Sequence, residues 1–95
     1  MTSQTLSQVV QQAREAAKAI LSTLEQTGHP QTNESSGVYL ALVTLQKRLA
    51  AQGPGGRVEE FAPELEELAA LCQGKLEPLK PLFEEAVRIA RVRRP

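Results

Sequence analysis

Apolar residues between Leu6 and Leu24 recur every three or four positions, which is the spacing of one face of an α-helix. At about 100° per residue, nine of them fall within an arc of about 140°, and polar residues occupy the opposite side. Gly28 and Pro30 then supply a stop, because glycine adopts the left-handed cap conformation and proline cannot continue the helix. The pattern predicts an amphipathic helix over about residues 5–27, with an alanine-rich middle that lets a neighbouring helix approach closely. The nine apolar residues are Leu6, Val9, Val10, Ala13, Ala16, Ala17, Ile20, Leu21 and Leu24.

A second helix is predicted over about residues 33–52, after a loop in which several residues are able to cap its start. Its first half contains the longest apolar run, Val38 to Val43, which also suits a buried strand. We interpret the run as helical, because no other segment of the chain would pair with such a strand. Apolar residues cover two stripes of this helix, and Leu40 faces a third direction. A helix that is apolar around so much of its circumference is either central to the fold or in contact with a partner. The first stripe comprises Val38, Leu42, Leu45 and Leu49, and the second comprises Tyr39, Val43 and Ala50.

The third predicted helix follows a linker rich in glycine and proline. This linker, residues 53–56, stops the second helix and is expected to be flexible. Apolar spacing then resumes and predicts a helix over about residues 57–73. Its main part is expected over about residues 63–73, with a helical turn before it, because proline is tolerated best in the first turn of a helix.

The fourth helix is predicted over about residues 81–93, after a connector at residues 75–80. Within this helix, Glu84 is able to pair with Arg88 one turn later. Four helical segments joined by short loops predict an all-α fold, a small antiparallel bundle of about four helices in which the first two are the longer. The whole chain, residues 1–95, is expected to form a single helical domain.

Composition excludes most catalytic and metal-binding sites. The 95 residues, 41% of them hydrophobic, suit one folded domain with a modest core and argue against disorder. The absence of Asp and the presence of one Cys and one His exclude EF-hand calcium loops, Asp-dependent triads and a tetrahedral zinc site. We therefore expect no catalytic residue, cofactor or metal, and predict that the protein is not an enzyme. No apolar run reaches the about 20 residues of a membrane span, and the first residues lack the pattern of a secretory signal, so we expect a cytoplasmic location.

Three features with possible chemistry have simpler interpretations. His29 is expected in a solvated turn, because no nucleophile or acid stands at a recognisable spacing from it. Cys72 is in register with the apolar stripe of its helix, so we expect it to pack in the core as a small hydrophobic residue. The segment Pro78–Pro81 has the spacing of a polyproline ligand, but a turn followed by a helix that begins with proline explains both prolines.

The net charge of zero hides a separation of charge in the second half of the chain. Five glutamates crowd one side of the third predicted helix. Three of them, Glu60, Glu64 and Glu67, have the spacing of a single ridge if the helix runs through Pro63. We interpret this ridge as a solvated face, with a surface for a basic partner as the alternative.

Four arginines crowd the end of the chain, and no acid lies among residues 86–95. Arg88 and Arg91 are expected to point to solvent, whereas Arg93 and Arg94 fall on the core side of the helix. The four therefore do not form one stripe suited to reading a nucleic-acid groove. We interpret them as a solubilising helix end, where cations are favourable, with contact to a partner, a membrane surface or a nucleic acid as alternatives.

These observations favour a non-enzymatic module that binds another protein through helix packing, such as a small adaptor, regulatory subunit or escort protein. The expected contact residues are Tyr39, Val43 and Leu40, which meet either a partner or a second copy of the chain. The competing interpretation is that the second helix is simply surrounded by the other three. A small nucleic-acid-binding regulator that uses the arginine cluster is the alternative function.

Overall fold

A computed structural model describes residues 5–52 and 57–91. All of the regular structure in these two ranges is helical, which confirms the predicted all-α bundle. The predicted linker, residues 53–56, lies outside the described residues, as does the end of the last predicted helix. No helix in the described ranges combines the length and the hydropathy needed to cross a membrane. The elements in chain order are α1 (Leu6–Thr27), α2 (Thr32–Gln52), the 3-10 helix η1 (Val58–Phe61), α3 (Ala62–Ala70), the 3-10 helix η2 (Gly74–Leu79) and α4 (Lys80–Arg91).

Both ends of α1 are fixed by local hydrogen bonds. The Thr5 hydroxyl accepts a bond from the Gln8 amide at 3.2 Å, and the Gln8 side chain accepts one from the Thr5 amide at 2.9 Å. Such a reciprocal capping box satisfies two amides that the first turn leaves without helical partners. At the other end Gly28 has φ of 64°, which confirms the predicted left-handed cap.

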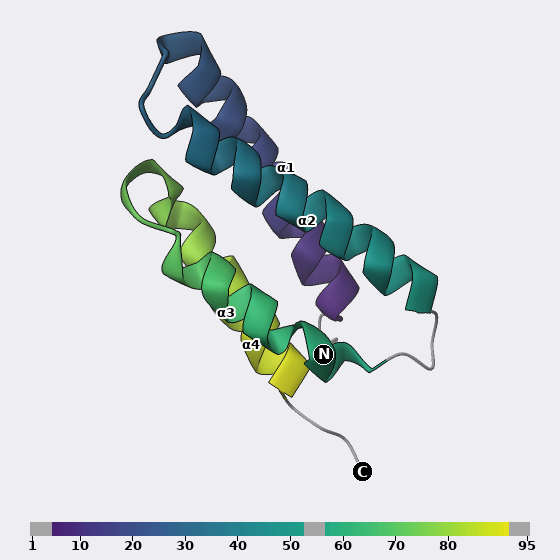
Figure 1. Ribbon diagram of the computed structural model, residues 1–95. Coiled ribbons are helices and arrows are strands. Elements are labelled where there is room, and N and C mark those ends of the chain that lie inside the picture. Colours follow the sequence, from purple (N-terminus) through teal and green to yellow (C-terminus); the bar gives the residue numbers. More distant parts are fainter. Residues whose placement is uncertain (1–4, 53–56, 92–95) are drawn as a thin grey trace.

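The central helix of the bundle is α1, and α2 lies at the periphery. Along its length α1 packs against α2 on one side and against α4 and η2 on the other. The second hairpin is formed by α3 and α4, which pack on each other. Figure 1 shows the two hairpins, α1 with α2 and α3 with α4, lying next to each other. Extensive backbone packing of α2 is therefore confined to α1, and α2 is not surrounded by the other three helices.

The core takes residues from all six elements, including the segment expected to be a connector. Residues 75–80 are not a simple connector, because most of them form η2, whose Leu76 and Leu79 are fully buried against the rest of the core. The third helix has the predicted helical turn before its main part: η1 precedes α3, and Pro63 lies in the first turn of α3. It differs from the prediction at its end, because α3 stops at Ala70 rather than near residue 73.

Within residues 5–52 and 57–91, one buried side-chain oxygen has no hydrogen-bond partner. The Ser35 hydroxyl in α2 is completely buried and makes no hydrogen bond. A buried hydroxyl without a partner costs about 1–3 kcal/mol of desolvation. We expect Ser35→Ala to raise the free energy of unfolding by about 1 kcal/mol, because it removes this cost and favours the helix. Urea unfolding measures the change.

Ser36→Ala is the matched control, because Ser36 is the adjacent residue of the same helix and is only half-buried. It supplies the same gain in helix propensity without removing a buried hydroxyl. Equal effects of the two substitutions, or a loss of stability in Ser35→Ala, would contradict the structural position of Ser35.

Candidate protein-binding surface

Polar contacts at two points join the hairpin of α1 and α2 to the segment that runs from α3 into η2. Near the end of α2, the Arg48 guanidinium lies 2.6 Å from a carboxylate oxygen of Glu64 and 4.9 Å from the centre of the Phe61 ring. Near its start, the Gln31 side chain donates to the Gln73 carbonyl at 3.0 Å and accepts from the Lys75 amide at 2.9 Å. Backbone packing between α2 and α3 is sparse, so these side-chain contacts add to the shared core in joining the two hairpins.

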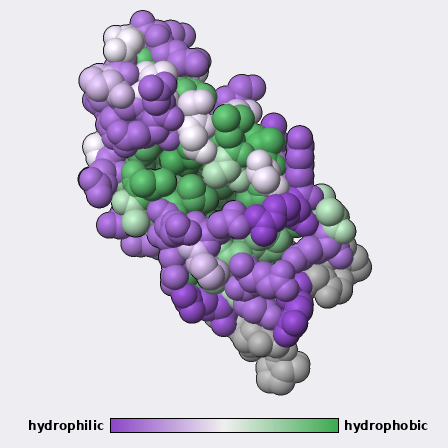
Figure 2. All heavy atoms as spheres, viewed as in Figure 1, coloured by the Kyte–Doolittle hydropathy of each residue, from purple (hydrophilic) through white to green (hydrophobic). Residues whose placement is uncertain are grey.

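Two leucines are exposed on these neighbouring elements. Leu40, in α2, has 58% of its surface exposed, and Leu71, directly after α3, has 53%. They are the two large hydrophobic residues that remain exposed in the described ranges. Figure 2 shows apolar surface gathered in the middle of the molecule, on the side that carries α2 and α3 in Figure 1. We call the surface around Leu40 and Leu71, with the exposed side chains of α2 and α3 next to them, the α2–α3 face.

The three apolar residues of α2 predicted to meet a partner lie in two different environments. Tyr39 and Val43 are half-buried, and Tyr39 packs against the core. They share a row with Gln46, whose side chain accepts a hydrogen bond from Arg14 of α1 at 3.0 Å. This row therefore lies along α1, whereas Leu40 points away from the bundle. Between Ser35 and Gln46, α2 carries no charged residue.

The predicted acidic ridge is divided. Glu60 belongs to η1, while Glu64 and Glu67 belong to α3, so the three do not lie on one continuous helix. Glu64 pairs with Arg48 of α2, and Glu66 pairs with Arg91 of α4. Glu60 and Glu67 are exposed and have no ion pair with any described residue. The acids are therefore partly links between helices and partly free charges at the surface.

Both described arginines of the C-terminal cluster are exposed and paired with carboxylates. Arg91 donates to Glu66 through Nε at 2.9 Å, which joins α4 to α3. Arg88 pairs with Glu85, three positions earlier, rather than with the predicted Glu84, and two of its guanidinium nitrogens bond to the two carboxylate oxygens. These bonds lower the pKa of the Glu85 carboxyl and raise that of Arg88. The described part of this helix end is therefore not a bare cationic surface.

The positions of the other two arginines, Arg93 and Arg94, lie outside the described residues. The helical spacing of the sequence predicts that they lie on the core side of the last helix, and this stays a prediction. The two described arginines contribute four nitrogens to carboxylate contacts within the chain, which leaves less of their charge available to a phosphate.

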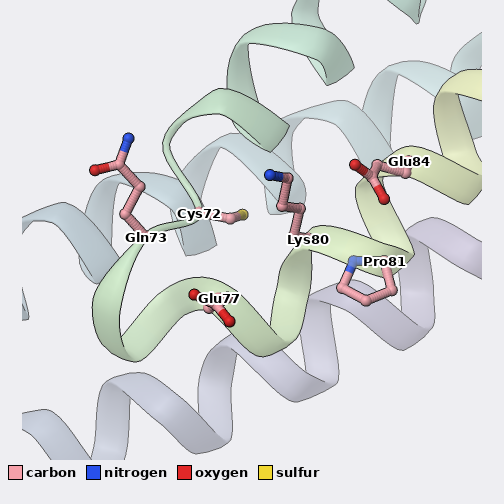
Figure 3. Close-up of a pocket in the computed structure, with 6 residues that line it drawn as sticks. All are labelled: Cys72, Gln73, Glu77, Lys80, Pro81 and Glu84. Carbon is pink, nitrogen blue, oxygen red and sulfur yellow. The ribbon is translucent and has the colours of Figure 1, made fainter.

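A shallow pocket between η2 and the start of α4 brings Cys72 close to several charged residues. Figure 3 shows Lys80 and Glu84, one turn apart on α4, projecting to the same side, with Glu77 across from them. Burial raises the pKa of the Cys72 thiol to about 11, and the nearby Lys80 offsets this only in part. Cys72 has only 3% of its surface exposed, and its thiol donates a hydrogen bond to the Leu68 carbonyl at 3.2 Å.

The residues that line this pocket pack the start of α4 and do not form a reactive site. A thiol that stays protonated at neutral pH is a poor nucleophile, and Cys72 sits in the core as predicted. Among the described residues, no group of three His, Cys, Asp or Glu side chains is placed to hold a metal ion. His29 lies in the loop between α1 and α2, where its Nδ1 accepts the Gln31 amide at 3.0 Å and so shapes the turn.

Comparison with known proteins supplies no relative from which to transfer a function. No protein-family model, curated protein or solved structure matches the chain. Sequence reasoning missed two residues at this surface, Leu71 and the exposed Lys47 of α2. The exposure of Leu71 depends on where α3 ends. The sequence pattern indicated this exposure only weakly, because Leu71 is apolar and precedes Cys72, which is itself buried.

Proposed function

We propose that this protein is a non-enzymatic interaction module, an adaptor, regulatory subunit or escort protein, that packs the α2–α3 face against a partner chain, either another protein or a second copy of itself. The observation that carries this proposal is the exposure of Leu40 and Leu71 on neighbouring elements. Covering both leucines in a complex would contribute about 1 kcal/mol each, because roughly half of each side chain is still in contact with water.

The architecture adds a second reason. A helix with apolar residues around much of its circumference is either enclosed by its own fold or covered by a partner. Because α2 packs extensively only on α1, its outward residues are available for a partner. The free, buried thiol of Cys72 is consistent with the expected cytoplasmic location, because the cytosol keeps thiols reduced.

Site-specific photo-cross-linking in the cells that make the protein tests this function. A benzophenone amino acid at position 40 is expected to give an adduct of one defined mass. The same amino acid at position 12, an exposed glutamine on the polar side of α1, is expected to give none. Absence of a defined adduct at position 40, or equal adducts at both positions, would overturn the proposed function.

A further inference from the structure

We propose that the partner of the α2–α3 face is a second copy of this chain, related to the first by a two-fold axis parallel to α2 and α3. The proposal rests on the proposed function, because it names the occupant of the same surface. Its support comes from the positions of two leucines and two unpaired charges along these helices.

The two exposed leucines lie at the same level of the bundle. Figure 1 shows α2 and α3 running in opposite directions, and Arg48 contacts Glu64 across them. From Arg48, Leu40 lies eight residues toward the start of α2, or about 12 Å along its axis. From Glu64, Leu71 lies seven residues toward the end of α3, or about 10 Å along that axis. Because the helices are antiparallel, both leucines lie toward the same end of the bundle from the Arg48–Glu64 contact. They therefore have nearly the same position along the helix axes.

Two charges of opposite sign lie at the other end of the same face. Lys47 is next to Arg48, and Glu67 lies three residues beyond Glu64 on the same side of α3. Both side chains are exposed, and neither forms an ion pair with any described residue. Along the helix axes they differ in level by about 3 Å, measured from the Arg48–Glu64 contact. The face therefore carries a leucine and a base on α2, and a leucine and an acid at matching levels on α3.

A two-fold axis parallel to the helices makes this face complementary to itself. The rotation places α2 of one copy over α3 of the other without reversing the helix direction. Leu40 then lies over the partner's Leu71, and Lys47 lies over the partner's Glu67. Each of these contacts occurs twice in such an interface.

The other two-fold axis that stacks two copies of this face lies in the plane of the face and runs perpendicular to the helices, and it gives a poorer match. When this axis passes through the middle of the face, Leu40 lies over Lys47 of the partner subunit and Leu71 lies over Glu67 of the partner subunit. Each leucine then buries a charge. Shifted to the level of the leucines, this axis leaves both charges without a partner. The parallel axis is therefore the arrangement that satisfies both the apolar and the charged residues.

Sedimentation equilibrium of the full chain tests the second copy. We expect a dimer whose dissociation constant rises about 100-fold in Leu40→Glu, because two leucine contacts are lost and two carboxylates are buried. Gln12→Glu is the matched control, since it adds the same charge on the exposed side of α1 and should leave the dimer unchanged. Wild-type chain that stays monomeric at millimolar concentration would overturn the proposal.

Charge reversal tests the pairing of Lys47 with the partner's Glu67. Lys47→Glu and Glu67→Lys are each expected to raise the dissociation constant about tenfold, because each places like charges together at two symmetric positions. The double variant, Lys47→Glu with Glu67→Lys, restores the pair with its sign exchanged and is expected to recover most of the affinity. Additive losses in the double variant would overturn this arrangement.

Disulfide formation between two different chains tests the direction of the axis. One chain carries Leu40→Cys and the other, with an added affinity tag, carries Leu71→Cys, both in a Cys72→Ala background. The expected main product joins position 40 of one chain to position 71 of the other. A predominance of products that join 40 to 40 or 71 to 71 would overturn the parallel axis.

The failure of this inference is distinguishable from the failure of the proposed function. In one outcome, the adduct from position 40 has the summed mass of this chain and a different protein, and the wild-type chain is monomeric. That outcome overturns the second copy as partner and keeps the proposed interaction module. No adduct together with a monomeric chain removes both.

Discussion

Leu42→Ala is expected to lower the free energy of unfolding by about 3 kcal/mol. Leu42 is completely buried in the core cluster, on the side of α2 that meets the rest of the bundle. Removing three side-chain carbons there costs both the transfer of those atoms from water and the cavity that the neighbours fill only in part. Urea unfolding followed by circular dichroism measures the loss, with the slope of the transition as a check that cooperativity is retained.

Leu40→Ala makes the same chemical change two residues earlier in the same helix and is the matched control. Because Leu40 is more than half exposed, we expect a change within about 0.5 kcal/mol at concentrations where the chain is monomeric. The comparison determines which side of α2 faces the core, independently of any partner. Similar losses at both positions would mean that Leu40 is covered within the monomer, and the α2–α3 face would then not be a free surface.

The first half of the fold was predictable because its signals are local. The apolar spacing of α1 continues over five turns, and the cap at Gly28 depends on the backbone freedom of one residue. For α2, the same pattern allowed two interpretations, since wide apolar coverage is expected of an enclosed helix and of a helix at an interface alike. Only the arrangement of the helices shows that α1 is the enclosed one.

The segment after α3 was harder to predict, although it contained a signal. Leu76 and Leu79 are three residues apart, which places them on one side of a 3-10 helix with three residues per turn. Periods of 3.6 and 2.0 residues do not detect this spacing in a segment of six residues. Pro78 and Gly74 also suggested a loop, because neither favours the interior of an α-helix.

The candidate surface was predictable in part. Leu40 was identified because it falls outside both apolar stripes of its helix, a property of the sequence alone. Leu71 and its level relative to Leu40 depend on how α3 pairs with α2, which is set by contacts between distant residues such as Arg48 and Glu64. The ion pairs of Glu66 and Arg91 are of the same kind, because they join two helices whose relative position no local pattern specifies.

Gly74→Ala is expected to lower the free energy of unfolding by about 2–3 kcal/mol. Gly74 has φ of 60°, a left-handed conformation that costs a residue with a β-carbon about 1 kcal/mol or more. A β-carbon at this position would also lie 2.6 Å from Oε1 of Gln31. The Gln31 side chain would have to move, and it would then lose its hydrogen bonds to Gln73 and Lys75. Thermal or urea unfolding measures the sum of these two costs.

Gly28→Ala separates the two costs. Gly28 has φ of 64°, but no atom lies within 4 Å of a β-carbon added there, so we expect a loss of only about 1 kcal/mol. A double-mutant cycle with Gln31→Ala then isolates the contact. In the Gln31→Ala background, Gly74→Ala is expected to cost no more than Gly28→Ala, because the side chain that the new β-carbon displaces is gone. A cost of Gly74→Ala that does not change in that background would mean that Gln31 does not hold the start of α2 against η2.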